Sequence, residues 1–372
     1  MINVLYITHE WREALGSTYS LINMLHSVRE TVCPIIILPH KGKVYDYLCN
    51  LGYTCYAIPF RLNIAPSSNL YLKYIPRKIW DFVINERAIF KMSQIIKDRH
   101  IQLVHSNTSV LTIGYELTRR NGLKHIWHLR EFQDLDFKMR PLSGWKILKD
   151  KINHSDAVIS ITKAIEKHFD INNKVSSYVI HDAVRSMKDI YSVYPKKKYL
   201  LFCGNILPNK GAEWALNIFI AFSATYKEYK LLYVGNVTTE YKNHLLQKAN
   251  NHDLQDKISF IGYKNDVRPY MAEATALLMC SQNEAQGRVT VEAMFYGCPV
   301  IGYKSGGTQE IIKDGVNGYL FTSIEEAKKK LELIIKGNNI QRITSNAQQY
   351  VKDEFSEEFY GIKLLSVYKS LL

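Results

Sequence analysis

Short apolar runs alternate with amphipathic segments along most of the chain. Each run holds four to six residues, a length typical of buried strands. Between the runs, apolar residues recur at helical spacing, as in residues 18–28, where Leu21, Met24, Leu25 and Val28 share one face. In the first half, the pattern predicts strands at residues 4–8, 35–38, 54–59, 103–107, 125–128, 157–161 and 177–180.

A second set of alternating runs follows a basic stretch that ends in Pro195-Lys196-Lys197-Lys198. Alternation of short strands and helices, twice over, is typical of two doubly wound α/β domains. We therefore expect a first domain over residues 1–185, a linker over 186–198 and a second domain over 199–355. In the second domain, the pattern predicts strands at residues 199–203, 230–235, 258–263, 276–279 and 300–303.

Residues 280–320 contain a strand, loop and helix that carry two glutamates. A strand ends near Leu278, Glu284 and Gly287 lie in the following loop, and Glu292 comes about one turn into the next helix. Amide groups at the start of a helix have no partner inside the helix and favour an anion. Carboxylates at the two positions can accept hydrogen bonds from sugar hydroxyls and from a ribose diol. Together these features indicate a site for a nucleotide diphosphate sugar.

The composition is that of a globular chain large enough for two domains: 372 residues, 47% hydrophobic and 22% charged. Residues 1–7 are apolar but have no basic start and no small-residue cleavage site, so we expect a first strand rather than a signal peptide. No apolar run is long enough to predict a transmembrane helix. The six cysteines form no CxxC pair and most lie in apolar runs, which predicts buried free thiols in a reducing cytosol.

The net charge of +13 indicates an anionic partner. Nucleic acid is one class, but the chain shows no zinc-finger spacing, no RRM signature and no Gly- and Lys-rich tail. An anionic membrane surface is the other class, because basic and aromatic residues mixed together suit a lipid interface; an ordinary solvated face is the open alternative. The mixed residues are Arg61, Tyr71, Lys73, Tyr74, Arg77, Lys78 and Trp80, with further basic residues in segments 85–99 and 145–152.

The loop and helix described above also carry a specific motif, S-x-x-E-x-x-G-x-x-x-x-E-A-M-x-x-G-x-P-V-I, followed by G-G-x-x-E. This motif resembles the donor site of the retaining glycosyltransferases of family 4, which have the GT-B fold. The resemblance is strong over residues 200–320 and weak in the first domain. The matching positions are Ser281, Glu284, Gly287, Glu292, Ala293, Met294, Gly297, Pro299, Val300, Ile301, Gly306, Gly307 and Glu310.

The resemblance implies an α/β protein with two Rossmann-like domains facing across a cleft, and a last helix, 356–372, that returns to the first domain. It implies that Glu284 aligns the sugar, that Lys210 contacts the diphosphate and that His128, at the end of a strand, lies near the reacting carbon. Acceptor contacts are expected from Ser17, Arg130 and Glu131. Donor contacts are expected from Gly16, Asn205, Lys210, Tyr263, Glu284, Ala285, Gln286, Gly287, Arg288, Val289 and Glu292.

The sequence departs from the family pattern at two places. Asn205 stands where the family has an arginine on the diphosphate, and we expect Arg288 to compensate for the lost charge. Asp182-Ala183-Val184 stands where the family has Asn-Gly-Val. The acidic pair Asp134 and Asp136 has polar flanks, so we expect a surface turn there rather than a metal site.

Together with the features of the donor loop, the resemblance implies a retaining, metal-independent hexosyltransferase without a cofactor. It would move a hexosyl group from a nucleotide diphosphate sugar to the hydroxyl of a carbohydrate or lipid-linked acceptor in polysaccharide or glycolipid synthesis. We expect it in the cytoplasm, with a possible peripheral place on the inner face of the plasma membrane. Two alternatives stay open: a sugar-nucleotide epimerase of similar fold, and a non-catalytic partner that binds nucleotide sugars for another transferase.

Overall fold

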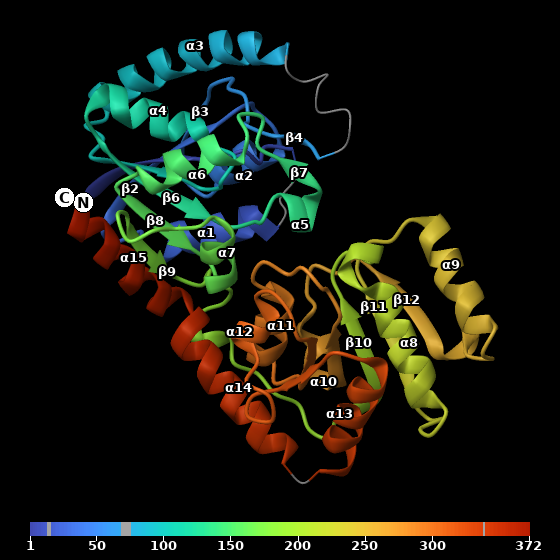
Figure 1. The fold of residues 1–372 in the computed structure, drawn as a ribbon. Coiled ribbons are helices and arrows are strands. Elements are labelled where there is room, and N and C mark those ends of the chain that lie inside the picture. The colour runs from blue at the N-terminus through green and yellow to red at the C-terminus, as the bar shows by residue number, and fades with distance from the viewer. Residues whose placement is uncertain (13–15, 68–75, 338) are drawn as a thin grey trace. The chain divides into compact units, whose positions relative to one another are not determined.

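The computed structural model describes residues 1–12, 16–67, 76–337 and 339–372. These residues form two compact units: residues 1–183 with 357–372, and residues 184–356 (Figure 1). The first stretch therefore ends at residue 183, against a predicted end at 185. The predicted linker is not a free connector, because Ile190 and Val193 pack against the core of the second unit.

A parallel sheet of seven strands forms the centre of the first unit, in the order β3-β2-β1-β5-β6-β8-β9. A small antiparallel pair joins β4 (Ala65–Pro66) to β7 (Met139–Arg140). The strands of the large sheet are β1 (Ile2–Ile7), β2 (Val32–Leu38), β3 (Thr54–Ala57), β5 (Leu103–Ser106), β6 (Lys124–Leu129), β8 (Ala157–Ser160) and β9 (Ser176–Val179). Its helices are α1 (Gly16–Ser27), α2 (Lys43–Asn50), α3 (Arg77–Asp98), α4 (Thr112–Asn121), α5 (Asp134–Phe137), α6 (Trp145–Asn153), α7 (Lys163–His168) and α15 (Glu357–Leu371).

Helices cover both faces of this sheet, which is why its strands are apolar runs rather than alternating ones. In β1, Val4 and Tyr6 pack into one cluster with α1, α2 and α15. Leu5 and Ile7 point to the opposite face and pack into a second cluster with α3 and α4. Successive side chains of a strand point to opposite faces, so one short run serves two cores.

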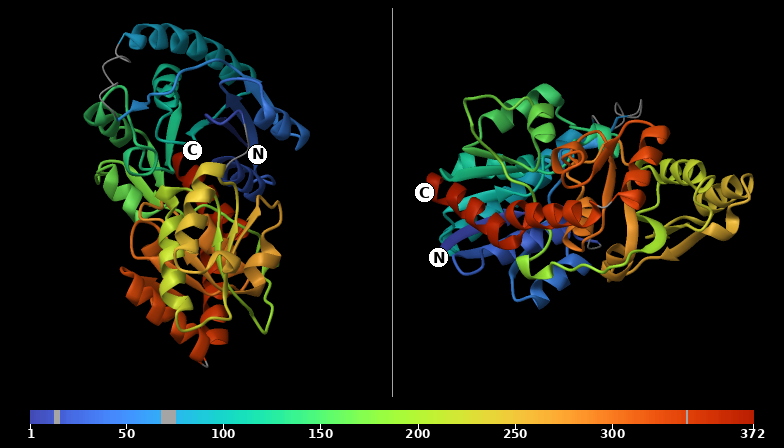
Figure 2. Two further views of the ribbon diagram at one scale, coloured as in Figure 1. Left: turned by 90° about the vertical axis from the view of Figure 1, so that its right-hand side faces the viewer. Right: turned by 90° about the horizontal axis from the view of Figure 1, so that it is seen from below.

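The last helix, α15, belongs to the first unit, and its far end lies beside β1 (Figure 2). The hydroxyls of Tyr368 and Tyr6 are 2.8 Å apart. A side chain on Gly361 would meet the carbonyl oxygen of Ser27 at 2.4 Å, so only glycine allows α15 this close to α1. Ile362 lies on the outer side of this helix and is 67% exposed. The buried stripe is Tyr360, Gly361, Leu364, Val367 and Tyr368.

The second unit has a parallel sheet of six strands in the order β12-β11-β10-β13-β14-β15, also covered on both faces. Its strands are β10 (Lys197–Cys203), β11 (Lys230–Val234), β12 (Ile258–Gly262), β13 (Ala274–Met279), β14 (Val300–Tyr303) and β15 (Tyr319–Phe321). Its helices are α8 (Ala212–Ser223), α9 (Thr239–Asn250), α10 (Arg268–Glu273), α11 (Arg288–Phe295), α12 (Thr308–Ile311), α13 (Ile324–Lys336) and α14 (Ile340–Phe355).

The structure shows the state of the cysteines and the character of the helices. The six cysteines are free thiols, and Cys280 and Cys298 are buried while the other four are half-buried. Among the helices in the described parts of the chain, none combines the length and apolarity needed to cross a bilayer.

Candidate donor site

The loop between β13 and α11 forms the centre of the candidate site, at the carboxyl edge of the second sheet. Gly287 caps the start of α11 in a left-handed conformation, with φ of +95°, which favours glycine. The helix then begins at Arg288, as the predicted strand-loop-helix unit requires. The edge at the carboxyl ends of parallel strands is where open α/β sheets bind ligands, and the start of α11 adds amide groups that favour an anion.

Lys210 and Glu284 form an ion pair in this loop region. The Nζ of Lys210 lies 2.9 Å from Oε2 of Glu284, and the Glu284 side chain is only 17% exposed. Lys210 ends a short helical turn, Pro208–Lys210, after β10. The next residue, Gly211, lies so close to the end of β13 that a side chain there would meet the carbonyl oxygen of Cys280 at 2.2 Å. That close approach brings the two predicted residues together.

The Gly306-Gly307 turn after β14 supports the loop that carries Glu284. The amide of Gly307 donates to the Glu284 carbonyl at 2.8 Å. A side chain on Gly306 would meet the same carbonyl oxygen at 2.5 Å, and one on Gly307 would meet the Ala285 carbonyl at 2.5 Å. In the sequence these glycines are only two positions of the motif. Their role as a support for the donor loop appears only in the folded chain.

Glu292 lies one turn into α11, and two arginines approach its carboxylate. The Nη2 of Arg185 is 3.2 Å from Oε1 of Glu292, and that of Arg288 is 3.9 Å away. Burial opposes the charge of Arg185, but Glu292, Tyr296 and Asp189 outweigh it and raise its pKa. Arg185 was not among the predicted site residues, because it falls outside the motif and at the edge of the expected linker.

The glycine turn after β10 lies against the start of α11. Gly204 has φ of +119°, and a side chain there would come within 3.9 Å of Val289. Gly235, after β11, leaves no room for a side chain, since one would meet the Gly204 carbonyl oxygen at 1.9 Å. Asn205 is exposed beside this turn. Tyr263, which follows the last residue of β12, is 58% exposed and lies two strands away from β10 in the sheet.

The predicted residues of the first unit have a different setting. His128 is fully buried, and its Nδ1 is 3.2 Å from Nη2 of Arg130 and 3.1 Å from Nε2 of His105. Burial, followed by the positive charge of Arg130, holds the pKa of His128 well below its usual range. An arginine can only donate, so Nδ1 of the neutral imidazole accepts and the proton sits on Nε2. That nitrogen lies 3.8 Å from Asp182.

Arg130 and Glu131, predicted to contact the acceptor, both have partners inside the first unit. Arg130 forms an ion pair with Asp182, and its Nε donates to Oδ1 of Asn107 at 3.0 Å. Glu131 accepts from the Ser109 amide at 3.0 Å and from the hydroxyls of Ser109 and Thr108. The departure at Asp182 thus has a structural reason: its carboxylate offsets a buried arginine, where an amide could not.

The remaining predictions fall in two places. Gly16 and Ser17 lie in the first turn of α1, and the residues just before them, 13–15, are outside the described residues. Asp134 and Asp136 lie in the short helix α5 rather than in an open turn, and burial raises the pKa of Asp136 to about 6. Within the described ranges, no three His, Cys, Asp or Glu side chains gather in a way that could hold a metal ion.

The chain is similar to known glycosyltransferases in sequence. Residues 184–350 match the family profile of Glycosyl transferases group 1, which covers most of the second unit. An uncharacterised glycosyltransferase of Methanocaldococcus jannaschii is 25% identical over 361 residues, 92% of this chain and 99% of that protein. N-acetyl-alpha-D-glucosaminyl L-malate synthase of Bacillus anthracis is 26% identical over 221 residues, 59% of this chain and 56% of the synthase.

Among solved structures, Anabaena HepE in complex with UDP has a TM-score of 0.83 at 19% identity, with both chains covered completely. A structure of HepE with UDP-glucose has a TM-score of 0.77 at 19% identity, again over both chains. These likenesses confirm the predicted fold, with two Rossmann-like domains. The chain is a glycosyltransferase of the GT-B fold, and its second unit carries a glycosyl transferases group 1 domain.

Proposed function

We propose that the chain is a retaining hexosyltransferase that takes its sugar from a uridine diphosphate sugar and needs no bound metal ion. The observation that carries the proposal is the Lys210–Glu284 pair at the start of α11. It puts a cation for a diphosphate and a carboxylate for sugar hydroxyls side by side. The UDP and UDP-glucose bound to HepE support the choice of base and donor class.

The residues of the site divide the work between the two ends of the donor. Lys210, Arg288 and the amide groups at the start of α11 would stabilise the charge that develops on the leaving diphosphate. Glu284 would accept hydrogen bonds from the hexose, and Glu292 would hold the ribose diol. In the structure Lys210 donates a hydrogen bond to Glu284. Donor binding would therefore exchange that ion pair for contacts to phosphate and sugar.

Retention would follow from attack on the same face that the diphosphate leaves. The bond from the anomeric carbon to the phosphate oxygen breaks, a bond from that carbon to the acceptor oxygen forms, and the acceptor proton passes to the departing phosphate. No protein nucleophile is needed for this path. Cations at Lys210 and Arg288 would take the part that a metal ion plays at other diphosphates.

We also propose an acceptor that is a carbohydrate or a lipid-linked saccharide, and a place in cell-surface polysaccharide or glycolipid synthesis. The protein would then work in the cytoplasm and associate peripherally with the inner face of the plasma membrane. The basic balance of the chain, +13, supports an anionic partner of this kind.

A thermal-shift panel with UDP, GDP and ADP, with and without EDTA, tests the donor site. A selective shift with UDP that EDTA leaves unchanged is the expected result. UDP release from UDP-hexose, with and without saccharide acceptors, then tests the activity. Conversion of the sugar nucleotide without acceptor would indicate an epimerase instead. Binding of UDP without turnover for any acceptor would indicate a non-catalytic binding partner.

A further inference from the structure

Helix α3 lies on the outer surface of the first unit (Figures 1 and 2). It carries a group of large apolar side chains that are exposed. Its inner face packs on the core through Ala88, Ile89, Met92 and Ile96. Solvent-exposed clusters of large apolar residues are uncommon on soluble monomers and mark interaction surfaces. The exposed residues, 37–73% accessible, are Ile79, Trp80, Phe82, Val83 and Phe90, which we name the α3 face.

The charges around the α3 face that are free to contact a partner are positive. Lys78, Arg87 and Lys91 are exposed on the same stretch of helix. The two acidic residues of 76–94 are both held by arginines. Asp81 accepts from Arg77 at 2.8 Å, and Glu86 bonds Arg120 through two contacts of 2.6 Å. An apolar strip with exposed cations and neutralised carboxylates is complementary to an anionic lipid surface.

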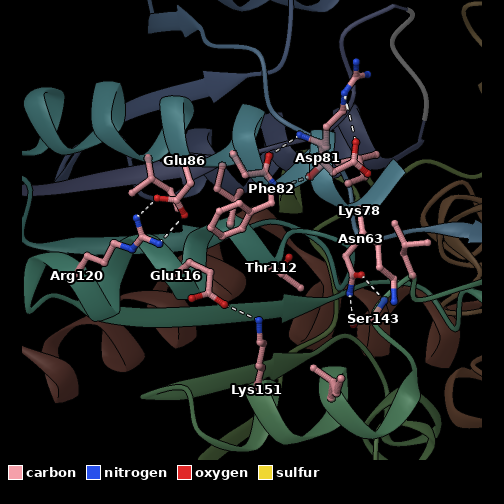
Figure 3. Close-up of a pocket in the computed structure, with 17 residues that line it drawn as sticks. Asn63, Lys78, Asp81, Phe82, Glu86, Thr112, Glu116, Arg120, Ser143 and Lys151 are labelled. Carbon is pink, nitrogen blue, oxygen red and sulfur yellow. Dashed lines mark hydrogen bonds and ion pairs between the residues drawn. The ribbon is translucent and has the colours of Figure 1, made fainter. Parts of the chain in front are cut away.

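A cavity of about 430 Å³ opens beside the α3 face, between α3, α4 and α6 (Figure 3). Phe82 belongs to both the face and the cavity lining, and Ile147, which is 50% exposed, lines the cavity from α6. Three ion pairs border it, and Lys78 adds a cation from the first turn of α3. The volume lies in the range of small-ligand pockets. The lining is part apolar, and each of its three carboxylates is paired with an arginine or lysine, so Lys78 is the further cation that suits a phosphate-bearing headgroup.

The second basic segment of the sequence, 145–152, adds only Ile147 and Lys151 to the lining of the cavity. In α6, Leu148 and Ile152 are buried, and Lys149 and Lys151 pair with Asp170 and Glu116. Of the aromatic residues predicted for the interface, Tyr71 and Tyr74, like Lys73, lie outside the described residues. The interaction surface therefore consists of the α3 face and the adjacent cavity.

We propose that the α3 face docks on an anionic lipid bilayer, with the headgroup of one lipid held in the adjacent cavity. Trp80 and Phe90 would enter the interface while Lys78, Arg87 and Lys91 contact lipid phosphates. This surface would hold the enzyme where lipid-linked acceptors are made. The proposal rests on the membrane location proposed above but not on the chemistry of the donor site.

Flotation of the full chain with lipid vesicles tests the proposal. One set contains phosphatidylcholine alone, and the other contains about 30% phosphatidylglycerol. We expect binding to the anionic set that weakens between about 0.05 M and 0.5 M salt. Binding should also shift the tryptophan emission to the blue, and Trp80→Phe should abolish that shift. Equal binding to neutral vesicles at both salt concentrations would overturn the charge argument.

Substitutions localise the contact. Trp80→Ser and Phe90→Ser should each lower vesicle affinity about tenfold. Ile362→Ser is the matched control, because Ile362 is as exposed as Phe90, at 67%, on a different helix of the same unit. Lys78→Ala in the cavity and Arg87→Ala on the helix should each cost about fivefold, while the exposed Lys167→Ala should cost nothing.

The alternatives give different results. Concentration-dependent self-association without vesicle binding, abolished by Trp80→Ser, would assign the α3 face to a second copy of the chain and overturn the proposal. Vesicle binding that all the α3 substitutions leave unchanged would place the contact elsewhere. UDP-induced thermal stabilisation should be the same in every variant. A failure confined to vesicle binding is thereby distinguished from a failure of the proposed donor site.

Discussion

The ammonium group of Lys210 lies 2.9 Å from the carboxylate of Glu284, although 74 residues separate them in the chain. In the proposed reaction these groups contact different parts of the donor, so donor binding would break their mutual bond. The two opposite charges offset each other at this distance. Removal of either residue therefore leaves the charge of the other without its partner.

Glu284→Ala should separate donor binding from transfer. Loss of the carboxylate frees Lys210, so we expect UDP affinity to be retained or to rise. Transfer should fall roughly a hundredfold or more, because the hexose is no longer aligned. Isothermal titration with UDP and a turnover assay with UDP-hexose measure the two effects. The exposed residue Glu240 on α9 gives the control, Glu240→Ala. Near-normal turnover of folded Glu284→Ala would remove the assigned role.

Lys210→Ala should show the converse pattern. Without the cation, UDP and UDP-hexose should both bind about tenfold or more weakly, and the difference from wild type should shrink as salt rises. Uridine, which has no phosphate, should bind both proteins equally. Calorimetric titrations of the three ligands at low and high salt provide the measurement. A loss of affinity for uridine as large as that for UDP would show that Lys210 does not act on phosphate.

Glu292→Ala should remove recognition of the ribose. We expect UDP affinity to fall about tenfold, as for loss of a charge-assisted hydrogen bond. The affinity for 2′,3′-dideoxy-UDP should stay the same, since that ligand has no diol to lose. Arg185→Ala should have a smaller effect in the same direction, because Arg185 only positions the carboxylate. If Glu292→Ala still discriminates UDP from its dideoxy analogue, the diol is bound by another group.

Gly306→Ala should disturb the donor loop more than a comparable substitution elsewhere. Gly306 and Gly315 both have positive φ, at +48° and +73°, so alanine costs about 1–2 kcal/mol of backbone strain at either position. Only at Gly306 does the new side chain also meet backbone, at 2.5 Å from the Glu284 carbonyl. That contact should add about 1–3 kcal/mol and lower UDP affinity. Denaturant unfolding and titration compare the variants, and equal behaviour would contradict the supporting role.

The buried histidines of the first unit should make its stability depend on pH. Burial lowers the pKa of His125 to about 3, and it holds those of His105 and His128 well below their usual range. In the unfolded chain these imidazoles take up protons near pH 6.5, whereas in the folded unit they stay neutral at that pH. The full stability is therefore present above about pH 6.5 and declines by about 1.4 kcal/mol per histidine for each pH unit below it.

Hydrogen exchange of the β5 and β6 amides follows this dependence in the first unit. His128→Gln should reduce the slope of stability against pH by the contribution of one histidine, about 1.4 kcal/mol per pH unit. Replacement of the exposed His154 should leave that slope unchanged. A slope that is unchanged by His128→Gln would mean that His128 is protonated in the folded state.

The sequence by itself determined the local elements and their class. Four- to six-residue apolar runs located the strands of the two large sheets except β15, because a strand covered on both faces must be apolar throughout. The motif around Glu284 and Glu292 located the donor loop, since Gly287 and the helix start are encoded within a few neighbouring residues. Fold class, the donor helix, Glu292 on that helix and Glu284 in the loop before it could therefore be predicted.

Only the tertiary structure decided which of these residues meet. The pairing of Lys210 with Glu284, the support from Gly306, the approach of Arg185 to Glu292 and the burial of His128 all depend on the order of strands in the sheets. Local periodicity does not encode that order. The same limit applies to α15, where packing against α1 selects the buried stripe Tyr360, Gly361, Leu364, Val367 and Tyr368.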